Sequence, residues 1–391
     1  MPRNSLTTRG VVLIALAGIA LSACTPPLPP DVLAAQAETN ITCQSGTLDV
    51  SVPEDFLGAM DAVGAALTSV CPDQGFIESV DKADAKLRIV DHAPTAEETA
   101  AFTAQACPTG TVIVVPAFGY AVALAYDVIG LEGLVMTPQA IAGILDGTVT
   151  SWEDPLITGP NADYDMTGLP DISVLYIDKP QGSVEAMTTW LTAEDPAAWP
   201  GGVTDTLSMG TAFPTQVDLM GELTLTEGTV AVIPAFSAVN NGIAIAAVPV
   251  GDLIISPDDT QLLKVGVAAT NVTVDAAGNL LAGPAIGGVP VAGQFDLASS
   301  KIVLAEGQPV IGWPIMGMAH MMVCDDPADP LALSAAQYVV RLAGQGSLET
   351  FGVTPLPEPI RVQTFTPLKV AASLASANPL PASAGPTPTS S

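Results

Sequence analysis

The sequence predicts an α/β protein with mostly parallel sheets flanked by helices, arranged as two lobes with a crevice between them. Short apolar runs rich in β-branched residues alternate with amphipathic helical stretches, which is the pattern of parallel sheets covered by helices. The chain has 391 residues, more than a single hydrophobic core usually organises. Because such folds bind ligands where their strands end, functional residues are expected in the loops that follow the strands.

The first predicted unit is a strand over Gly46–Val52 followed by a helix over Glu54–Val70. Thr95 is placed to cap a further helix over Ala96–Gln105, with acidic residues favourably in its first turn. Two short strands are expected between these helices, at Gly75–Val80 and Lys86–Val90.

The middle of the chain contains a long apolar run over Thr111–Asp127, whose β-branched content favours strand over buried helix. A helix follows over Thr137–Asp146, with Thr137 as its cap and Pro138 as its first residue. Later elements are a helix at Thr215–Leu223, a buried strand at Gly228–Pro234 and an amphipathic helix at Ala332–Leu342.

The stretch Ile172–Leu191 is predicted to form a strand, a tight loop and a helix that starts near Ser183, a good capping residue. Such a junction presents backbone N–H groups and the positive end of a helix dipole, an arrangement that suits an anion. Most junctions of this kind bind nothing, so this motif alone leaves a purely structural role open.

The charge balance argues against nucleic acid as a partner. The chain contains 11 basic and 40 acidic residues, a net charge of −29. Binding to a phosphate backbone relies on Lys and Arg, and an anionic membrane surface is disfavoured for the same reason.

The N-terminus resembles a lipoprotein signal peptide, predicted over residues 1–23. Arg3 and Arg9 precede the apolar run Val11–Leu21, which is too short to span a bilayer comfortably. The run ends in Leu-Ser-Ala-Cys, which resembles a lipobox and predicts lipidation at Cys24. An ordinary signal peptide cut nearby is the alternative. Residues 24–40 then form a Pro-rich tether.

Four cysteines remain in the exported chain, which is typical of two disulfides with three possible pairings. Cys43 and Cys71 flank one strand–helix unit, and Cys107 and Cys324 adjoin later strands, so Cys43–Cys71 and Cys107–Cys324 are favoured. A four-Cys zinc site is the alternative, weakened by the absence of any C-x-x-C pair.

Other chemistry has little support. His92 lies in a predicted turn and is a candidate ligand contact, whereas His320 sits among apolar residues and is expected in the core. We expect neither a metal nor a cofactor, and the sequence shows no nucleotide-binding glycine motif. No Ser–His–Asp arrangement is apparent, so we do not expect an enzyme.

Several stretches, in the same order, resemble the substrate-binding protein of the bacterial phosphate ABC transporter. The most specific is Gly130–Pro155, and Ala85–Thr95, Gly228–Gly242 and Phe351–Pro357 add to it. The resemblance implies a two-lobed, type II periplasmic-binding-protein-like fold with a hinge between the lobes. Lobe I would take residues 41–120 plus 316–370 and lobe II residues 121–315, with a disordered tail over 371–391.

The resemblance also implies ligand contacts in the crevice. Asp91 falls where the family has its ligand-contacting Asp, Gly182 and Ser183 match the end of its phosphate loop, and Ser51 best matches the hydroxyl of its first loop. The family's Arg falls on Ile177, its loop Asp on Lys179 and its loop Ser on Gln181. The predicted site is Ser51, Asp91, Lys179, Gln181, Gly182 and Ser183.

The sequence is therefore interpreted as an extracytoplasmic, lipid-anchored solute-binding protein, monomeric, that binds a small oxyanion, phosphate first, and delivers it to an ABC permease. The alternative is a divergent surface lipoprotein that keeps the fold but binds a different ligand or none. Ile177 in place of Arg favours the alternative, because it removes a bidentate partner for the anion.

Overall fold

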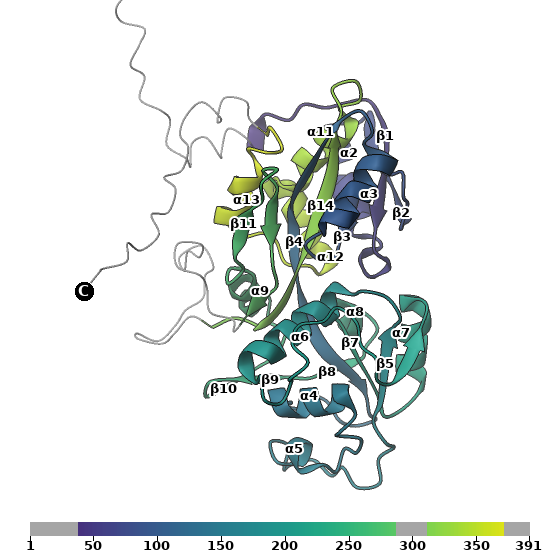
Figure 1. Ribbon diagram of the computed structural model, residues 1–391, viewed down its shortest axis with the longest axis vertical. Coiled ribbons are helices and arrows are strands. Elements are labelled where there is room, and N and C mark those ends of the chain that lie inside the picture. Colours follow the sequence, from purple (N-terminus) through teal and green to yellow (C-terminus); the bar gives the residue numbers. More distant parts are fainter. Residues whose placement is uncertain (1–37, 287–310, 371–391) are drawn as a thin grey trace, which may run out of the picture.

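The computed structural model describes residues 38–286 and 311–370. Its elements form two α/β lobes, the upper and lower halves of Figure 1. We call the upper half lobe I and the lower half lobe II; the residue boundaries expected from the sequence stay a prediction.

Strand β4 (Thr111–Asp127) runs through both lobes and is buried along almost its whole length. Its first part, Thr111–Ala121, pairs antiparallel with β14 (Ile315–Asp325), and its second part, Val122–Asp127, pairs antiparallel with β7 (Thr229–Pro234). The strand prediction for this run is confirmed, because neighbours on either side satisfy its backbone groups.

Lobe I is built on the strand order β2-β1-β3-β14-β4. Strand β1 (Gly46–Val52) pairs in parallel with β2 (Gln74–Val80) and β3 (Leu87–Val90), so their carboxyl ends lie at one edge. The helices of this lobe are α2 (Ala59–Val70), α3 (Ala96–Ala106), α11 (Leu331–Val339), α12 (Leu342–Phe351) and α13 (Glu358–Thr364).

The single helix predicted over Glu54–Val70 is wrong at its start. A short 3-10 turn, η1 (Glu54–Phe56), precedes α2, and the two are separated by Gly58, whose φ is +100°. Glycine adopts this left-handed backbone conformation without the steric cost of a side chain. The break places Glu54 and Asp55 in η1, after the end of β1, instead of on helix α2.

Lobe II contains β5 (Ser173–Ile177), which pairs in parallel with β6 (Thr211–Phe213) and β7. The prediction for Ile172–Leu191 is confirmed in outline, since β5 leads into helix α6 (Gly182–Glu194). The other helices of this lobe are α4 (Pro138–Asp146), α5 (Pro155–Thr158), α7 (Gln216–Leu225) and α8 (Ala235–Asn240).

Smaller elements complete the described chain. Strand β8 (Ala244–Ile245) pairs with β4, and the hairpin β9 (Val248–Val250) with β10 (Leu253–Ile255) follows. Next come α9 (Thr260–Val267), the hairpin β11 (Val272–Val274) with β12 (Leu280–Ala282), and β13 (Ala285–Ile286), which pairs with β14.

Both favoured disulfides are confirmed. Cys43 is bonded to Cys71 and Cys107 to Cys324, with Cα–Cα distances of 5.4 and 5.2 Å. The second joins residues 217 positions apart and ties the end of α3 to β14.

Within residues 38–286 and 311–370, no helix has the length and apolar character to cross a membrane. The predicted signal peptide, Cys24 and the C-terminal tail lie outside the described residues.

Candidate functional site

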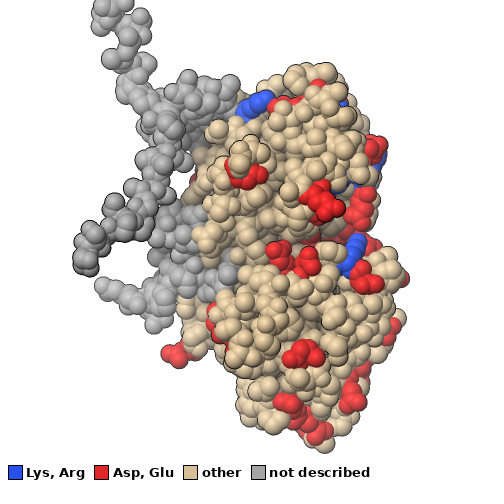
Figure 2. All heavy atoms as spheres, viewed as in Figure 1, with Lys and Arg blue, Asp and Glu red and all other residues tan. Residues whose placement is uncertain are grey.

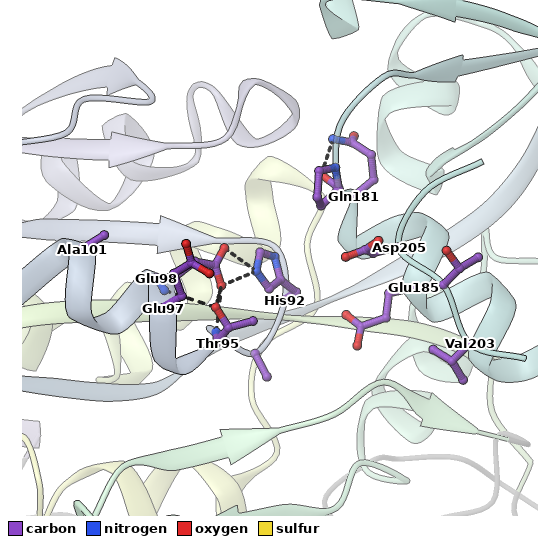
Figure 3. A pocket seen from close by; sticks show the side chains of 12 residues that line it. His92, Thr95, Glu97, Glu98, Ala101, Gln181, Glu185, Val203 and Asp205 are labelled. Carbon is purple, nitrogen blue, oxygen red and sulfur yellow. Dashed lines mark hydrogen bonds and ion pairs between the residues drawn. The ribbon is translucent and has the colours of Figure 1, made fainter. Parts of the chain in front are cut away.

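A cavity of about 690 Å³ lies between the lobes, beside the start of α6. Lobe I contributes the turn after β3 and the first turns of α3, and lobe II contributes the β5–α6 loop and the segment before β6 (Figure 3). The lining residues are His92, Ala93, Thr95, Glu97, Glu98, Ala101, Pro180, Gln181, Glu185, Val203, Thr204 and Asp205.

The start of α6 is held by a carboxylate from the other lobe. The backbone N–H of Gly182 donates to Asp91 Oδ2 at 2.6 Å. Gln181, the N-cap, makes no side-chain capping bond, so Asp91 supplies the anionic oxygen that this helix terminus favours. Ser183, predicted to cap the helix, is instead its second residue, which corrects that prediction.

Gly182 is required by the closeness of the two lobes at this point. A Cβ added there would lie 2.2 Å from the carbonyl oxygen of Asp91 and 2.5 Å from the Tyr120 hydroxyl. That hydroxyl donates to the same carbonyl at 2.6 Å. Strand β4, the turn after β3 and α6 therefore meet at this one position.

His92 is clamped between two carboxylates of lobe I. Its Nδ1 lies 2.8 Å from Asp91 Oδ1, and its Nε2 lies 3.0 Å from Glu98 Oε1 (Figure 3). Burial opposes the charge on His92, but the hydrogen bonds to Asp91 and Glu98 outweigh it and raise its pKa to about 10. The bond from His92 lowers the pKa of Glu98 to about 2. The pair is thus an ion pair at neutral pH.

The remaining charges around the cavity are mainly negative. Glu185 and Asp205 stand on the lobe II side, across from His92 and Glu98 (Figure 3). Burial, together with Asp91, Asp205 and Glu98, raises the pKa of Glu185 against the opposing effect of His92. Figure 2 shows acidic side chains at the junction of the lobes on the face in view.

The structure brings only part of the predicted site together. Asp91 and Gly182 are in direct contact, and Gln181 lines the cavity. Ser51 and Ser183 are both buried. Lys179 forms an ion pair with Asp81 of lobe I, with its Nζ 3.7 Å from Asp81 Oδ2. The role of all six residues as ligand contacts stays a prediction.

Ile177, which the resemblance aligns with the family's Arg, does not line the cavity. It is buried in a second apolar core of lobe II, with Leu219 and Leu223 of α7. Lys179 is close enough to Asp55 to lower the pKa of that carboxyl group, so a cation of lobe II does act near the ends of β1 and β3.

The sequence reasoning missed two carboxylates. Glu54 Oε2 accepts a hydrogen bond from the N–H of Gln216, the first residue of α7, at 2.8 Å. Asp55, beside it, has an Oδ1 that is shielded from solvent and has no hydrogen-bond partner within the described residues. The available signal was an acidic pair directly after β1, because β1 and β3 are parallel and end at the edge where Asp91 lies.

Comparison with known proteins places this fold among the two-lobed phosphate-binding proteins. A high-affinity periplasmic phosphate-binding protein, solved with bound phosphate, superposes with a TM-score of 0.55 at 15% identity, covering 82% of this chain and 93% of that one. An ancestral soluble variant of the human phosphate-binding protein gives 0.56 at 16%, with the same coverage. At this identity the likeness establishes the fold.

Curated sequences point the same way. The phosphate-binding protein PstS2 of Mycobacterium bovis and its counterpart in Mycobacterium tuberculosis are each 23% identical over 242 residues, 61% of this chain. The match spans 60% of each relative's length. No family model matches the chain. The class is thus a two-lobed solute-binding protein fold, and within it the chain resembles the substrate-binding protein of the bacterial phosphate ABC transporter.

Proposed function

We propose that this chain is an extracytoplasmic, lipid-anchored solute-binding protein that holds a small oxyanion, phosphate first, between its lobes for an ABC permease. The relatives named above bind phosphate by their own descriptions. The segment before the described residues supports export and anchoring through its basic and apolar runs and Cys24.

One observation carries the oxyanion proposal. The first N–H of α6 already binds an anionic oxygen, that of Asp91, at 2.6 Å. Helix α6 has 13 residues, so its N-terminus has a full dipole to favour an anion. Ser183, the second residue of the helix, is buried and carries a hydroxyl group that can donate a hydrogen bond. His92 and Lys179 supply positive charge nearby.

The carboxylates do not exclude phosphate, because the ion is itself a hydrogen-bond donor. A protonated phosphate oxygen donates to a carboxylate, so Asp91 acts as an acceptor for the ligand once it is displaced from Gly182. The charge of Glu98 is already matched by His92 at 3.0 Å. The remaining negative charge lowers the encounter rate more than it changes the contacts within the cleft.

The proposal is tested by isothermal titration of phosphate into the tag-free domain 43–370, unfolded and refolded first to remove carried ligand. We expect micromolar or tighter binding, weakened about tenfold or more by Ser183→Ala and Asp91→Ala, since each removes a hydrogen bond to the anion. Lys179→Ala shows whether this lysine replaces the missing Arg. Ser208→Ala, on an exposed residue of lobe II, is the matched control. Absence of heat up to millimolar phosphate would refute phosphate as the ligand.

The second candidate function is a surface lipoprotein that keeps the fold and binds a different ligand or none. It is favoured by the contact at the start of α6, because the N–H of Gly182 has a protein partner in the Asp91 carboxylate. Ile177, which the resemblance aligns with the family's Arg, adds to it, because it is buried in an apolar cluster and offers no side-chain donor to an anion. A protein of this kind would give no heat with phosphate or with any other small oxyanion.

A further inference from the structure

Asp55 occupies a position fixed by the core of lobe I. It lies in η1, directly before Phe56, whose ring is fully buried and packs edge-on against Phe118 and Tyr120 at centroid distances of 5.2 and 5.1 Å. Phe118 and Tyr120 both belong to β4. The backbone that carries Asp55 therefore has little freedom to turn the carboxyl group elsewhere.

Asp55 differs from its two neighbouring carboxyl groups, Glu54 and Asp91, in having a buried oxygen without a partner among the described residues. Glu54 is bonded to the N–H of Gln216, and Asp91 to Gly182 and His92. The Oδ1 of Asp55 is shielded from solvent and has no hydrogen-bond partner in the part of the chain that the structure describes. A buried polar atom without a partner is unfavourable, and in a binding cleft a ligand atom is a natural partner for it.

The charged and titratable groups around Asp55 come from both lobes. Asp91 faces it from the turn after β3, Glu54 from η1 itself, Tyr120 from β4, and Lys179 from the β5–α6 loop of lobe II. Burial and the two carboxylates raise the pKa of Asp55 to about 7, against the opposing effect of Lys179. The carboxyl group is therefore protonated in mildly acidic solution and is then a hydrogen-bond donor.

We propose that Asp55 is a ligand-contacting residue that donates a hydrogen bond to an oxygen of the bound oxyanion. This inference rests on the proposed function and deepens it, because it makes oxyanion binding dependent on one proton of the protein. Protonated Asp55 adds a donor to the N–H of Gly182 and the hydroxyl of Ser183. Ionised Asp55 places a third carboxylate beside Asp91 and Glu54 and repels the anion.

The test compares phosphate affinity of the wild-type domain and Asp55→Asn at pH 5.5, 6.5, 7.5 and 8.5. The Asn amide donates at every pH, and the ionisation of phosphate itself is common to both proteins and cancels in the ratio of their affinities. We expect the ratio of wild-type to Asp55→Asn affinity to be the same at pH 5.5 and pH 6.5, where most of Asp55 is protonated. Above neutrality the wild type should lose about tenfold per pH unit relative to the variant, the slope for one linked proton. Asp55→Ala should bind less tightly than Asp55→Asn at every pH.

Proton uptake gives a second readout. Titrations at pH 7.5 in buffers of different ionisation enthalpy should show that the wild type takes up more protons on binding phosphate than Asp55→Asn does. Asp73→Asn, at an exposed carboxylate of lobe I, should behave as the wild type in both measurements. Circular dichroism melts establish that each variant is folded.

The outcomes separate the two proposals. Measurable phosphate binding with the same pH profile and the same proton uptake in the wild type and Asp55→Asn would overturn the role of Asp55 and leave the proposed function intact. Phosphate binding by neither protein at any pH would overturn the proposed function, and the role of Asp55 with it. Binding by Asp55→Asn alone at pH 8.5 is the result expected if ionised Asp55 repels the anion.

Discussion

Asp91 is the residue on which the cleft depends most. Its two carboxylate oxygens face different partners, His92 at 2.8 Å within lobe I and the N–H of Gly182 at 2.6 Å in lobe II. Its backbone carbonyl accepts from Tyr120. One acidic side chain thus sets the position of a cation, a helix terminus and a turn, and any solute that binds at α6 must rearrange it.

We predict that the His92–Glu98 ion pair makes stability depend on pH. The folded pKa of His92 is raised to about 10 from 6.5, so its contribution is complete below pH 6.5 and is lost as pH rises toward 10. Glu98, lowered to about 2, contributes above pH 4.5 and loses this as pH falls toward 2. His92→Gln should therefore lower the unfolding free energy by about 2 kcal/mol at pH 6 and by clearly less at pH 9.5.

Urea denaturation of both proteins at the two pH values measures this difference. Equal losses of stability at pH 6 and pH 9.5 would mean that His92 acts through packing and not through its charge.

At the scale of single elements, helix termini decide which groups face the cleft. The side chain of Thr95 accepts from the N–H of Glu98, and the Glu98 carboxylate accepts from the N–H of Thr95, forming a capping box at the start of α3. The same Glu98 reaches His92. The capping box that starts α3 therefore also positions Glu98, a charged residue that lines the cavity.

Thr95→Ala and Thr137→Ala form a matched pair. Each removes a threonine whose side chain caps a helix, α3 or α4, so each should lower the unfolding free energy by about 1 kcal/mol. Thr95→Ala should also lower the pKa of His92, because Glu98 loses one of its anchors, whereas Thr137→Ala should leave it unchanged. Titration of the His92 ring by NMR separates the two. Equal pKa values of His92 in both variants would contradict the link between cap and cleft.

At the scale of the whole molecule, contacts between protein groups join the two lobes. Asp91 holds the N-terminus of α6, Glu54 holds the N-terminus of α7, and Lys179 lies 3.7 Å from Asp81. The first two place lobe I carboxylates at lobe II helix dipoles. These contacts hold the two lobes against each other, and a solute bound at either helix terminus would compete with the carboxylates.

We predict that removing both carboxylates opens the molecule. The double variant Glu54→Ala/Asp91→Ala should have a larger radius of gyration than the wild type in phosphate-free buffer, measured by small-angle X-ray scattering. Asp49→Ala is the control, because Asp49 pairs with Lys82 inside lobe I at 2.6 Å. If the double variant scatters as the wild type does, other contacts keep the lobes together.

The sequence by itself determined most of the secondary-structure elements and the pairing of the two disulfides. The alternation of strands and helices, the caps at Thr95 and Thr137, and the two disulfide pairings follow from patterns that are local or depend on chain order. The resemblance to phosphate-binding proteins also came from short stretches in order. Gly58 was the local exception, because its positive φ ends a pattern that otherwise predicts one helix.

Only the tertiary structure decided how the site is assembled. Asp91 and Gly182 are 91 residues apart, and Glu54 and Gln216 are 162 apart. Whether such groups touch depends on how two lobes are oriented, which no periodicity or spacing encodes. The lack of a partner for Asp55 Oδ1 among the described residues has the same origin, since it is decided only when the neighbours from both lobes are in place. The physical reason is that burial and charge interactions are set by three-dimensional distance.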